Sequence, residues 1–459
     1  MNKRFRSGFG LVEALLSAAL LSIFATAFLG AVLYAQEGGV IAGDFSRAVF
    51  IADEGLQAVR NISQSGFLNL TDGTYGLATS TNIWSLAGSV DTVDIFSREI
   101  SISSVDSNTK LVTSTVAWQQ AGRRAGRVSL ATRFTNWARS AGAWFSPRES
   151  TSINFAGNQD GVKVAVLGNY AYVVRSGGNP NFAVVEITSP DSPQIRGTLA
   201  LSGVPTNIYV SGNFAYVTNT SNTQEMQIIN ISNPNSPVQV GSIDLSGSGD
   251  GLGVFVSGFV AYVTRAQHAG PEFHSVNVSD PAFPVALGSF GFAGNVSEIA
   301  IIGTDAYVAS GEDGAELYVI NIANPALLQT RGSLNLPGTT DAITIVGTSQ
   351  YMFLGQGNFI RAVNVSNPAN PLPSGSLDLG GAINDLALYS VDNTLLFAAT
   401  SNANLEFQVV DISTPANPSP WSSVNLSGAA LGAAYSESHD RVLVAGASNN
   451  SELSVIAPQ

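Results

Sequence analysis

The first pattern along the chain is one long apolar run near its N-terminus. Residues 1–8 are basic, and the run from Phe9 to Ala35 that follows contains Glu13 as its single charged residue. A helix of this length spans roughly 40 Å, which is enough to cross a bilayer. Basic residues before such a run favour retention of that end in the cytoplasm. The pattern therefore predicts a membrane-spanning helix over 9–35.

Beyond residue 35 the hydrophobic spacing remains helical and then changes to alternation. Apolar residues three and four apart predict that the helix continues to residue 63 and presents one stripe to a core. This stripe comprises Phe45, Val49, Ala52, Leu56, Val59 and Ile62. From 64 to 137 the alternation predicts a small antiparallel sheet, with strands at 95–102, 110–118 and 126–134. Residues 138–149 are predicted to form a linker.

From residue 150 to 459 a single pattern repeats every 44–47 residues. Each unit has an apolar strand and a tight turn, an Ala-Tyr-Val-like strand, a third strand that ends in a Pro-rich turn, and a fourth strand. This period is the size of one four-stranded propeller blade. The second-strand element occurs as GNYAYV (168–173), GNFAYV (212–217), GFVAYV (258–263), GTDAYV (303–308), GTSQYM (347–352), DNTLLF (392–397) and HDRVLV (439–444). Seven copies predict a seven-bladed β-propeller.

The fourth strand has only six copies for the seven units, from TLALSG (198–203) to SVNLSG (423–428). A matching segment, SINFAG (152–157), lies upstream of the first unit, and the chain ends just after a third strand. We expect the seventh blade to take its outer strand from this N-terminal segment, which would remove an open sheet edge. The fold class is therefore mainly β with one long N-terminal helix: the helix and a small antiparallel sheet, then the propeller. A β-solenoid is the competing fold, but its repeats are shorter.

Three interpretations of the N-terminus compete. A secretory signal peptide needs a shorter apolar core and an A-x-A-like cleavage site, which residues 32–35 fit poorly. A plain membrane anchor fits the length but leaves Glu13 unexplained, because a carboxylate in a membrane helix costs about 2.5–3.5 kcal/mol. The third interpretation is a filament subunit, in which such a charge finds a partner.

The stretch from Gly8 to Glu13, GFGLVE, resembles the prepilin signal of type IV pilins and pseudopilins. The resemblance implies cleavage by a prepilin peptidase between Gly8 and Phe9 and methylation of the new amine at Phe9. It also implies that Glu13 pairs with the N-terminal amine of a neighbouring pilin subunit, so the partners would be other pilins. The implied location is the bacterial cytoplasmic membrane as a single-pass protein, then a pilus or the cell surface.

The repeats of residues 150–459 resemble the LVIVD-type repeat of bacterial surface propellers. The shared elements are the Ala-Tyr-Val strand, the third strand and Pro-rich turn of segments such as QIINISNPNSP, and a fourth strand such as SIDLSG. The Gly-His and Trp-Asp signatures of WD40 blades are absent from the sequence. The resemblance implies a fold and names no ligand.

Charge divides the chain into two unequal parts. Residues 1–150 hold 13 Lys and Arg against 11 Asp and Glu, whereas residues 151–459 hold 7 against 22. The acidic surface expected for residues 151–459 repels phosphate backbones. We therefore expect no nucleic acid partner for the propeller. The absence of cysteine excludes disulfides, thiolate metal sites and cysteine nucleophiles.

The candidate chemistry is sparse, and we expect no catalytic residues, cofactor or metal. Polar loops between the second and third strands suit a sugar or peptide ligand; the loop with the most functional groups contains Arg265, His268, Glu272 and His274. A second candidate is a set of carboxylates at the starts of the innermost strands, where a propeller places them around the channel mouth. These are Asp160, Asp250, Glu298, Asp341 and Asp385. Solvated loops and turn caps are the alternatives for both.

These patterns favour a minor or tip pilin whose propeller binds an extracellular glycan or protein. A pseudopilin of a secretion or DNA-uptake system is the alternative within the same class. A membrane-anchored propeller hydrolase is the alternative from another class. It would need metal ligands in the channel, whereas the inner strands are mostly Val, Ile, Ala and Gly.

Overall fold

A computed structural model describes residues 11–65, 69–80, 83–105, 109–120, 124–135 and 141–459. The chain divides into two compact units, Met1–Ala138 and Arg139–Gln459. The predicted processing residues Gly8 and Phe9 lie outside the described residues, and so does the side chain of Glu13. Each unit is described by itself.

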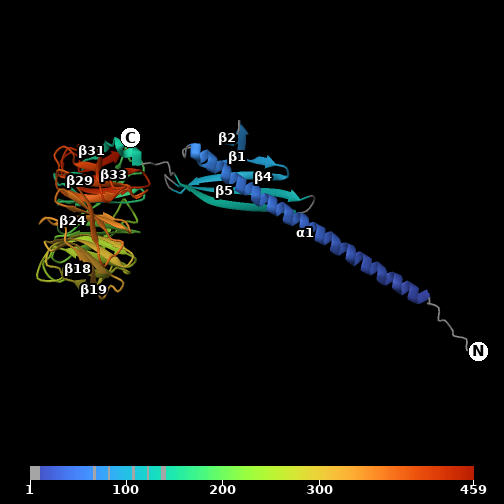
Figure 1. Cartoon of the computed structure of the whole chain (residues 1–459), viewed down its shortest axis with the longest axis horizontal. Helices are drawn as coiled ribbons and strands as arrows, with labels where there is room; N and C mark the ends of the chain where they lie inside the picture. The colour runs from blue at the N-terminus through green and yellow to red at the C-terminus, as the bar shows by residue number, and fades with distance from the viewer. Residues whose placement is uncertain (1–10, 66–68, 81–82, 106–108, 121–123, 136–140) are drawn as a thin grey trace, which may run out of the picture. The chain divides into compact units, whose positions relative to one another are not determined.

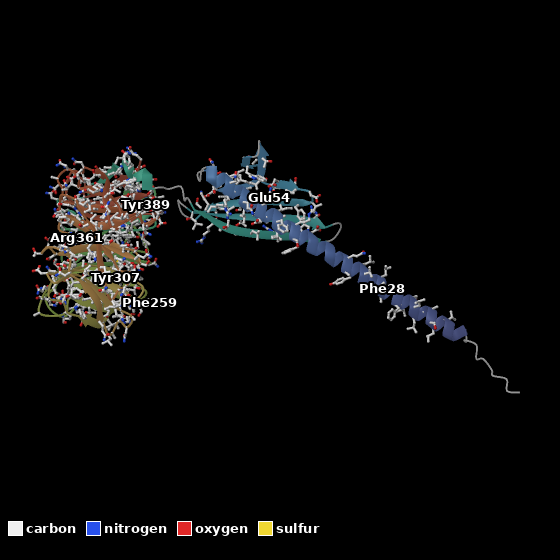
Figure 2. The ribbon with its side chains drawn as sticks, in the orientation of Figure 1. Phe28, Glu54, Phe259, Tyr307, Arg361 and Tyr389 are labelled. Carbon is white, nitrogen blue, oxygen red and sulfur yellow. The ribbon has the colours of Figure 1, made fainter. Side chains whose placement is uncertain are left out.

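The first unit is built on one helix, α1 (Leu11–Ser65), which extends well beyond the sheet that it packs against (Figure 1). Its Leu15–Gln36 stretch has a mean hydropathy of 2.2 and none of it is buried in the unit. Phe28 marks this extended part in Figure 2, whereas Glu54 lies over the sheet. Within the described residues, this is the one helix long and apolar enough to cross a membrane, as a membrane anchor or a signal sequence would be.

The sheet of the first unit is antiparallel and has the order β2-β1-β4-β5-β6, with β3 paired to β4. Its strands are β1 (Gly73–Ser80), β2 (Ile83–Ala87), β3 (Asp91–Val93), β4 (Phe96–Ser104), β5 (Thr109–Gln120) and β6 (Arg124–Thr135). The helix packs on this sheet through Ala52, Val59 and Ile62, as the stripe predicts. Phe45 is instead 53% exposed, and the buried residues of this turn of the helix are Asp44 and Ala48. A Cβ atom on Gly55 would lie 2.6 Å from the Ser114 Oγ.

One buried guanidinium joins the helix to the sheet of the first unit. Arg98 of β4 donates to a carboxylate oxygen of Asp91 at 2.8 Å and to the Glu54 carboxylate at 3.1 Å. It also donates to the main-chain carbonyl of Ile51 at 3.2 Å. The Arg98 side chain is 3% exposed, so this planar donor fixes the position of α1 on the sheet.

The second unit contains seven four-stranded antiparallel sheets in its described residues. The first four are β8 (Gly161–Leu167), β9 (Tyr170–Arg175), β10 (Phe182–Glu186) and β11 (Gln194–Leu199); β12 (Pro205–Ser211), β13 (Phe214–Asn219), β14 (Met226–Asn230) and β15 (Val238–Ile243); β16 (Gly251–Ser257), β17 (Val260–Arg265), β18 (Phe273–Asn277) and β19 (Val285–Phe290); and β20 (Val296–Ile302), β21 (Asp305–Glu312), β22 (Ala315–Asn321) and β23 (Gln329–Leu334). The other three are β24 (Ala342–Gly347), β25 (Tyr351–Gln356), β26 (Phe359–Asn364) and β27 (Leu372–Asp378); β28 (Ile383–Leu388), β29 (Leu395–Thr400), β30 (Phe407–Asp411) and β31 (Ser419–Val424); and β32 (Ala430–Ser436), β33 (Arg441–Gly446), β34 (Leu453–Ala457) and β7 (Arg148–Ile153).

The first strands of these sheets form a ring. Each contacts the first strand of the next sheet, and β32 contacts β8. The contact is close at the junction of the last and first sheets, where a Cβ atom on Gly432 would lie 2.8 Å from the Lys163 Cα. Apolar side chains between neighbouring sheets form the core. This is the arrangement of a β-propeller, and the sheets are called blades 1 to 7 in chain order.

Blade 7 combines the two ends of the unit, as the strand pattern predicts. The N-terminal strand β7 pairs with the C-terminal strand β34 and brings Ile153 opposite Leu453. A short 3₁₀ helix, η2 (Ala141–Phe145), precedes β7 and adds a second connection, because the Gln459 amide donates to the Ala143 carbonyl at 2.9 Å.

The prediction of a linker over 138–149 is wrong for its second half. Trp144 is fully buried and packs 4.6 Å from Phe397, centroid to centroid. Its indole N–H donates to Asp440 at 3.3 Å. The sequence around it has polar and small residues that are typical of a linker, but one large aromatic side chain is enough to hold the segment on blades 6 and 7.

Candidate functional site

One repeated position of the seven innermost strands surrounds the propeller axis; five of its residues carry side chains and two are glycines. Each of these strands has a register irregularity near its start, and the residue two positions after the last pair before it occupies the same repeated position. These seven residues, called the axial layer, are Lys163, Asn207, Gly253, Glu298, Thr344, Asp385 and Gly432. Lys163 of blade 1 contacts side chains of blades 4 and 6, so the layer spans the axis.

An ion cluster occupies the axial layer. The Lys163 ammonium lies 2.6 Å from an Asp385 oxygen and 2.9 Å from a Glu298 oxygen. Exposed fractions of these side chains are 14%, 6% and 18% for Lys163, Asp385 and Glu298. One cation therefore neutralises one of two largely buried carboxylates, and the layer retains one negative charge.

The other polar groups of the layer complete the hydrogen bonding of Glu298. One oxygen accepts from Lys163 and, at 3.3 Å, from the Asn207 amide. The second accepts from the Thr344 hydroxyl and, at 3.2 Å, from the Ile345 backbone amide. Four donors thus occupy the acceptor positions of this carboxylate.

Burial and charge pairing set the protonation of the cluster in opposite directions. Burial raises the pKa of Asp385 to about 6; the Lys163 charge opposes this shift, and the Glu298 charge adds to it. Burial alone would raise the pKa of Glu298, but Lys163 and the hydrogen-bond donors hold it below its usual value. Burial likewise opposes the charge of Lys163, yet the two carboxylates raise the pKa of its ammonium. Lys163 therefore stays protonated, and Asp385 is the group that titrates closest to neutral pH.

The five carboxylates predicted to surround the channel mouth do not form one ring. Glu298 and Asp385 belong to the axial layer and share Lys163. Asp160, Asp250 and Asp341 instead precede their strands and are half-buried. The difference arises because the latter three occupy a turn position, where Asp160 and Asp250 accept main-chain N–H groups through their carbonyls.

The charged residues of the predicted ligand loop are buried rather than presented to solvent. Arg265 is fully buried and donates to the carbonyls of Ser246, Gly247 and Gly249. Its guanidinium also lies 3.7 Å from Glu225 of the preceding blade. Arg265 therefore connects blades 2 and 3 and stabilises the fold; it does not face solvent as a ligand-binding residue would.

Glu272 of the same loop is one of a repeated set of buried carboxylates. Each accepts the backbone N–H at the end of the fourth strand of its own blade, at 2.5–2.9 Å. These strand-end carboxylates are Glu225, Glu272, Glu316, Glu406 and Glu452, with partners Leu245, Phe292, Leu336, Leu426 and Phe155. In blade 1 the Asn181 side chain accepts from Leu201 in the same way. The repetition marks a fold-stabilising interaction.

The two histidines of the loop are also largely enclosed. His268 Nδ1 lies 3.1 Å from the Ala266 carbonyl, and its ring covers Gly247 and Gly249. His274 hydrogen-bonds through Nε2 to the Pro271 carbonyl at 2.8 Å. Burial lowers the pKa of His274 to about 4, so its imidazole is neutral at pH 7. Among the described residues, no group of three or more His, Asp or Glu side chains could hold a metal ion.

A cavity of about 330 Å³ opens beside the axial layer. Asn207 and Glu298 of the layer line its polar end, and its walls are mainly Ile and Val with Tyr209 and Phe255. Sequence reasoning identified Glu298 and Asp385 but missed Lys163, Asn207, Thr344 and the aromatic pair. Alignment of the repeats places Lys163, Asn207 and Thr344 at one position with Glu298 and Asp385, and that position is the most chemically varied in the inner strand. The aromatic pair lies two residues later in its strands.

Comparison with known proteins supports the propeller. The model of the LVIVD repeat matches residues 160–200, 202–245, 293–335 and 399–426. No curated protein matches the chain. Structure neighbours include U3-55K and the RRP9 WD40 repeats, each 13% identical with a TM-score of 0.54 and covering 68% of this chain. The match spans 100% of the U3-55K chain and 98% of the RRP9 chain.

A third neighbour is the Cps50 (Swd1) β-propeller domain of Myceliophteria thermophila. It is 12% identical with a TM-score of 0.54, and the match covers 68% of this chain and 100% of that one. At such identities the likeness shows the fold alone. The second unit is therefore a β-propeller domain with LVIVD repeats, a scaffold that could mediate binding.

Proposed function

We propose that the chain is a minor or tip subunit of a type IV pilin-like filament that displays its propeller for extracellular binding. The observation that carries the proposal is the register of the N-terminal signal. A basic leader ends at Gly8, Phe9 follows, and Glu13 is the single charge of the apolar run. In a packed helical bundle, such a carboxylate is stabilised by an opposite charge, here the amine of a neighbouring subunit.

The first unit supports this proposal. Its helix α1 has an exposed apolar first part, and its second part packs on a small antiparallel sheet. This is the plan of a pilin, in which the apolar part of the helix assembles into the filament and the sheet forms the head. A propeller of about 310 residues on every subunit would crowd a filament, which favours low-abundance incorporation.

We propose a binding role for the propeller rather than a catalytic one. Lys163 neutralises one of the two carboxylates of the axial layer, and four donors surround Glu298. Lys163 is held in its charged form by two carboxylates, so its amine is not a nucleophile. A pseudopilin of a secretion or DNA-uptake system shares the assembly chemistry and differs in the machine that it serves.

N-terminal mass spectrometry of sheared surface filaments tests the proposal. We expect a mature chain that starts at methylated Phe9. A Glu13→Gln variant should be processed in the same way but remain in the membrane fraction, because only the assembly charge is removed. An intact leader would identify a plain membrane anchor, and a start beyond Ala35 would identify a secretory signal; either result would overturn the pilin assignment.

A further inference from the structure

The cavity beside the axial layer has an aromatic wall at a position where the other five blades have Ala or Val. Tyr209 of β12 and Phe255 of β16 lie two residues after the axial layer, with ring centroids 4.6 Å apart and planes tilted by 38°. The same position in the other blades is occupied by Ala165, Ala300, Val346, Ala387 and Ala434. The two rings thus stand together on one side, and small side chains leave the space in front of them.

The polar end of the cavity attracts a cation but offers it no free hydrogen-bond acceptor on Glu298. The axial layer has two carboxylates against one ammonium, and residues 151–459 as a whole are strongly acidic. A low-dielectric cavity concentrates such a field. Because four donors already occupy the Glu298 oxygens, a primary amine would have to displace one of them, whereas a quaternary ammonium would not.

We propose that this cavity binds a quaternary ammonium group, such as the trimethylammonium head of a choline-bearing surface molecule. Aromatic faces attract such cations through their negative quadrupoles, and the attraction grows when the cation is desolvated. The volume of about 330 Å³ falls within the range of roughly 300–1,000 Å³ that is usual for small-molecule pockets. A saccharide would need many hydrogen-bonding groups, and the walls are mainly Ile and Val. The proposal deepens the binding role above and rests on it only for the extracellular setting.

Calorimetric titration of the full chain, in a non-ionic detergent without choline, tests the proposal. Choline and its uncharged isostere 3,3-dimethylbutan-1-ol have nearly the same shape, so their comparison isolates the positive charge. We expect choline to bind at least about tenfold more tightly than the isostere. Equal affinity for both, binding of neither, or binding of glucose in place of choline would overturn the assignment.

Two variants locate the binding in the aromatic pair. Tyr209→Leu and Phe255→Leu should each weaken choline binding by about tenfold while circular dichroism shows an unchanged fold. The matched control is Phe259→Leu, because Phe259 lies in the β16–β17 turn and is 73% exposed (Figure 2); its choline affinity should be unchanged. Equal losses at all three positions would contradict the cavity site.

The outcomes for the site and for the pilin assignment are separable. Choline binding by a chain that keeps its leader would support the cavity and refute the filament role. A processed filament subunit that binds neither choline nor its isostere would support the filament role and refute the cavity.

Discussion

The propeller has two buried polar sets, and they differ in how they follow the repeat. The strand-end carboxylates place the same residue type at the same position in five blades, each on a backbone N–H of its own blade. The axial layer places Lys, Asn, Gly, Glu, Thr, Asp and Gly at one repeated position. Repetition of one chemistry indicates maintenance of the fold. Variation at a repeated position indicates a site where the ring has acquired individual partners.

The two sets also differ in what their contacts join. The Glu406 carboxylate connects the third strand to the end of the fourth strand within blade 6, so its loss is local. Lys163 connects blades 1, 4 and 6 through Glu298 and Asp385, so its loss leaves charges in several blades without a counter-ion. The comparison therefore predicts a larger effect at the axis than at a strand end.

Lys163→Met is the substitution with the largest expected effect. It leaves two largely buried carboxylates facing each other, and breaking a buried pair in this way costs about 3–5 kcal/mol of unfolding free energy. Urea unfolding of the propeller at pH 7 measures it. Adding Asp385→Asn should recover part of the loss, because one uncompensated charge is then removed.

Lys110→Met in the first unit is the matched control for that experiment. Lys110 also forms a short ion pair, 2.7 Å from Asp72, but Asp72 is 52% exposed. Exposed pairs contribute under about 1 kcal/mol because water and salt screen them. Similar losses for the two lysine variants would show that the axial cluster has no special role.

The strand-end set should give a smaller, local effect. Glu406→Ala removes the acceptor of the Leu426 amide at 2.8 Å and should cost about 1–3 kcal/mol, because the buried N–H is left unsatisfied. Glu406→Gln retains an acceptor oxygen and should cost less. Hydrogen exchange should show faster opening confined to blade 6; Asp313→Ala, at an exposed turn, serves as the neutral control. Exchange that spreads over all blades would contradict the local role.

The sequence predicted the parts of this fold that are encoded by periodicity. Alternation and the 44–47-residue period were sufficient for seven blades and for an N-terminal strand in the last blade, although that strand is Arg148–Ile153 and begins four residues before the predicted segment 152–157. Periodicity does not reveal where a bulge interrupts a strand. A one-residue shift at a bulge moves each following side chain to the opposite face of the sheet. For this reason Lys163 was missed, although Glu298 and Asp385 were selected.

Burial was the second property that the sequence pattern did not reveal. Arg265 and Glu272 occur in a polar loop sequence, yet both are almost fully buried, because each satisfies main-chain groups of its own or a neighbouring blade. The available signal was the Glu that recurs at or just before the start of the third strand, in TQEM, PEFH, GAEL, NLEF and NSEL. Trp144 gave no periodic signal, because it belongs to no repeat.

The smallest expected effect is on the pH dependence of stability, where the axis and the periphery act in opposite directions. The pKa of Asp385 is raised from 3.8 to about 6, so the folded state binds its proton more tightly and acidification through pH 6 stabilises the propeller. The charged groups that face Asp385 are Lys163 of β8 and Glu298 of β20. The pKa of His274 is lowered from 6.5 to about 4, so the unfolded state gains the proton first and acidification below pH 6.5 destabilises the propeller.

Two variants separate these opposing contributions. Between pH 7 and pH 5, Asp385→Asn should lose about 1 kcal/mol more stability than the parent chain, and His274→Gln about 2 kcal/mol less. Urea midpoints at the two pH values give both differences, and contributions common to all three proteins cancel. Because the parent chain contains both groups, it should show the intermediate slope. Parallel slopes for all three proteins would mean that neither Asp385 nor His274 changes its proton affinity on folding, and the opposite contributions inferred for the two groups would then be wrong.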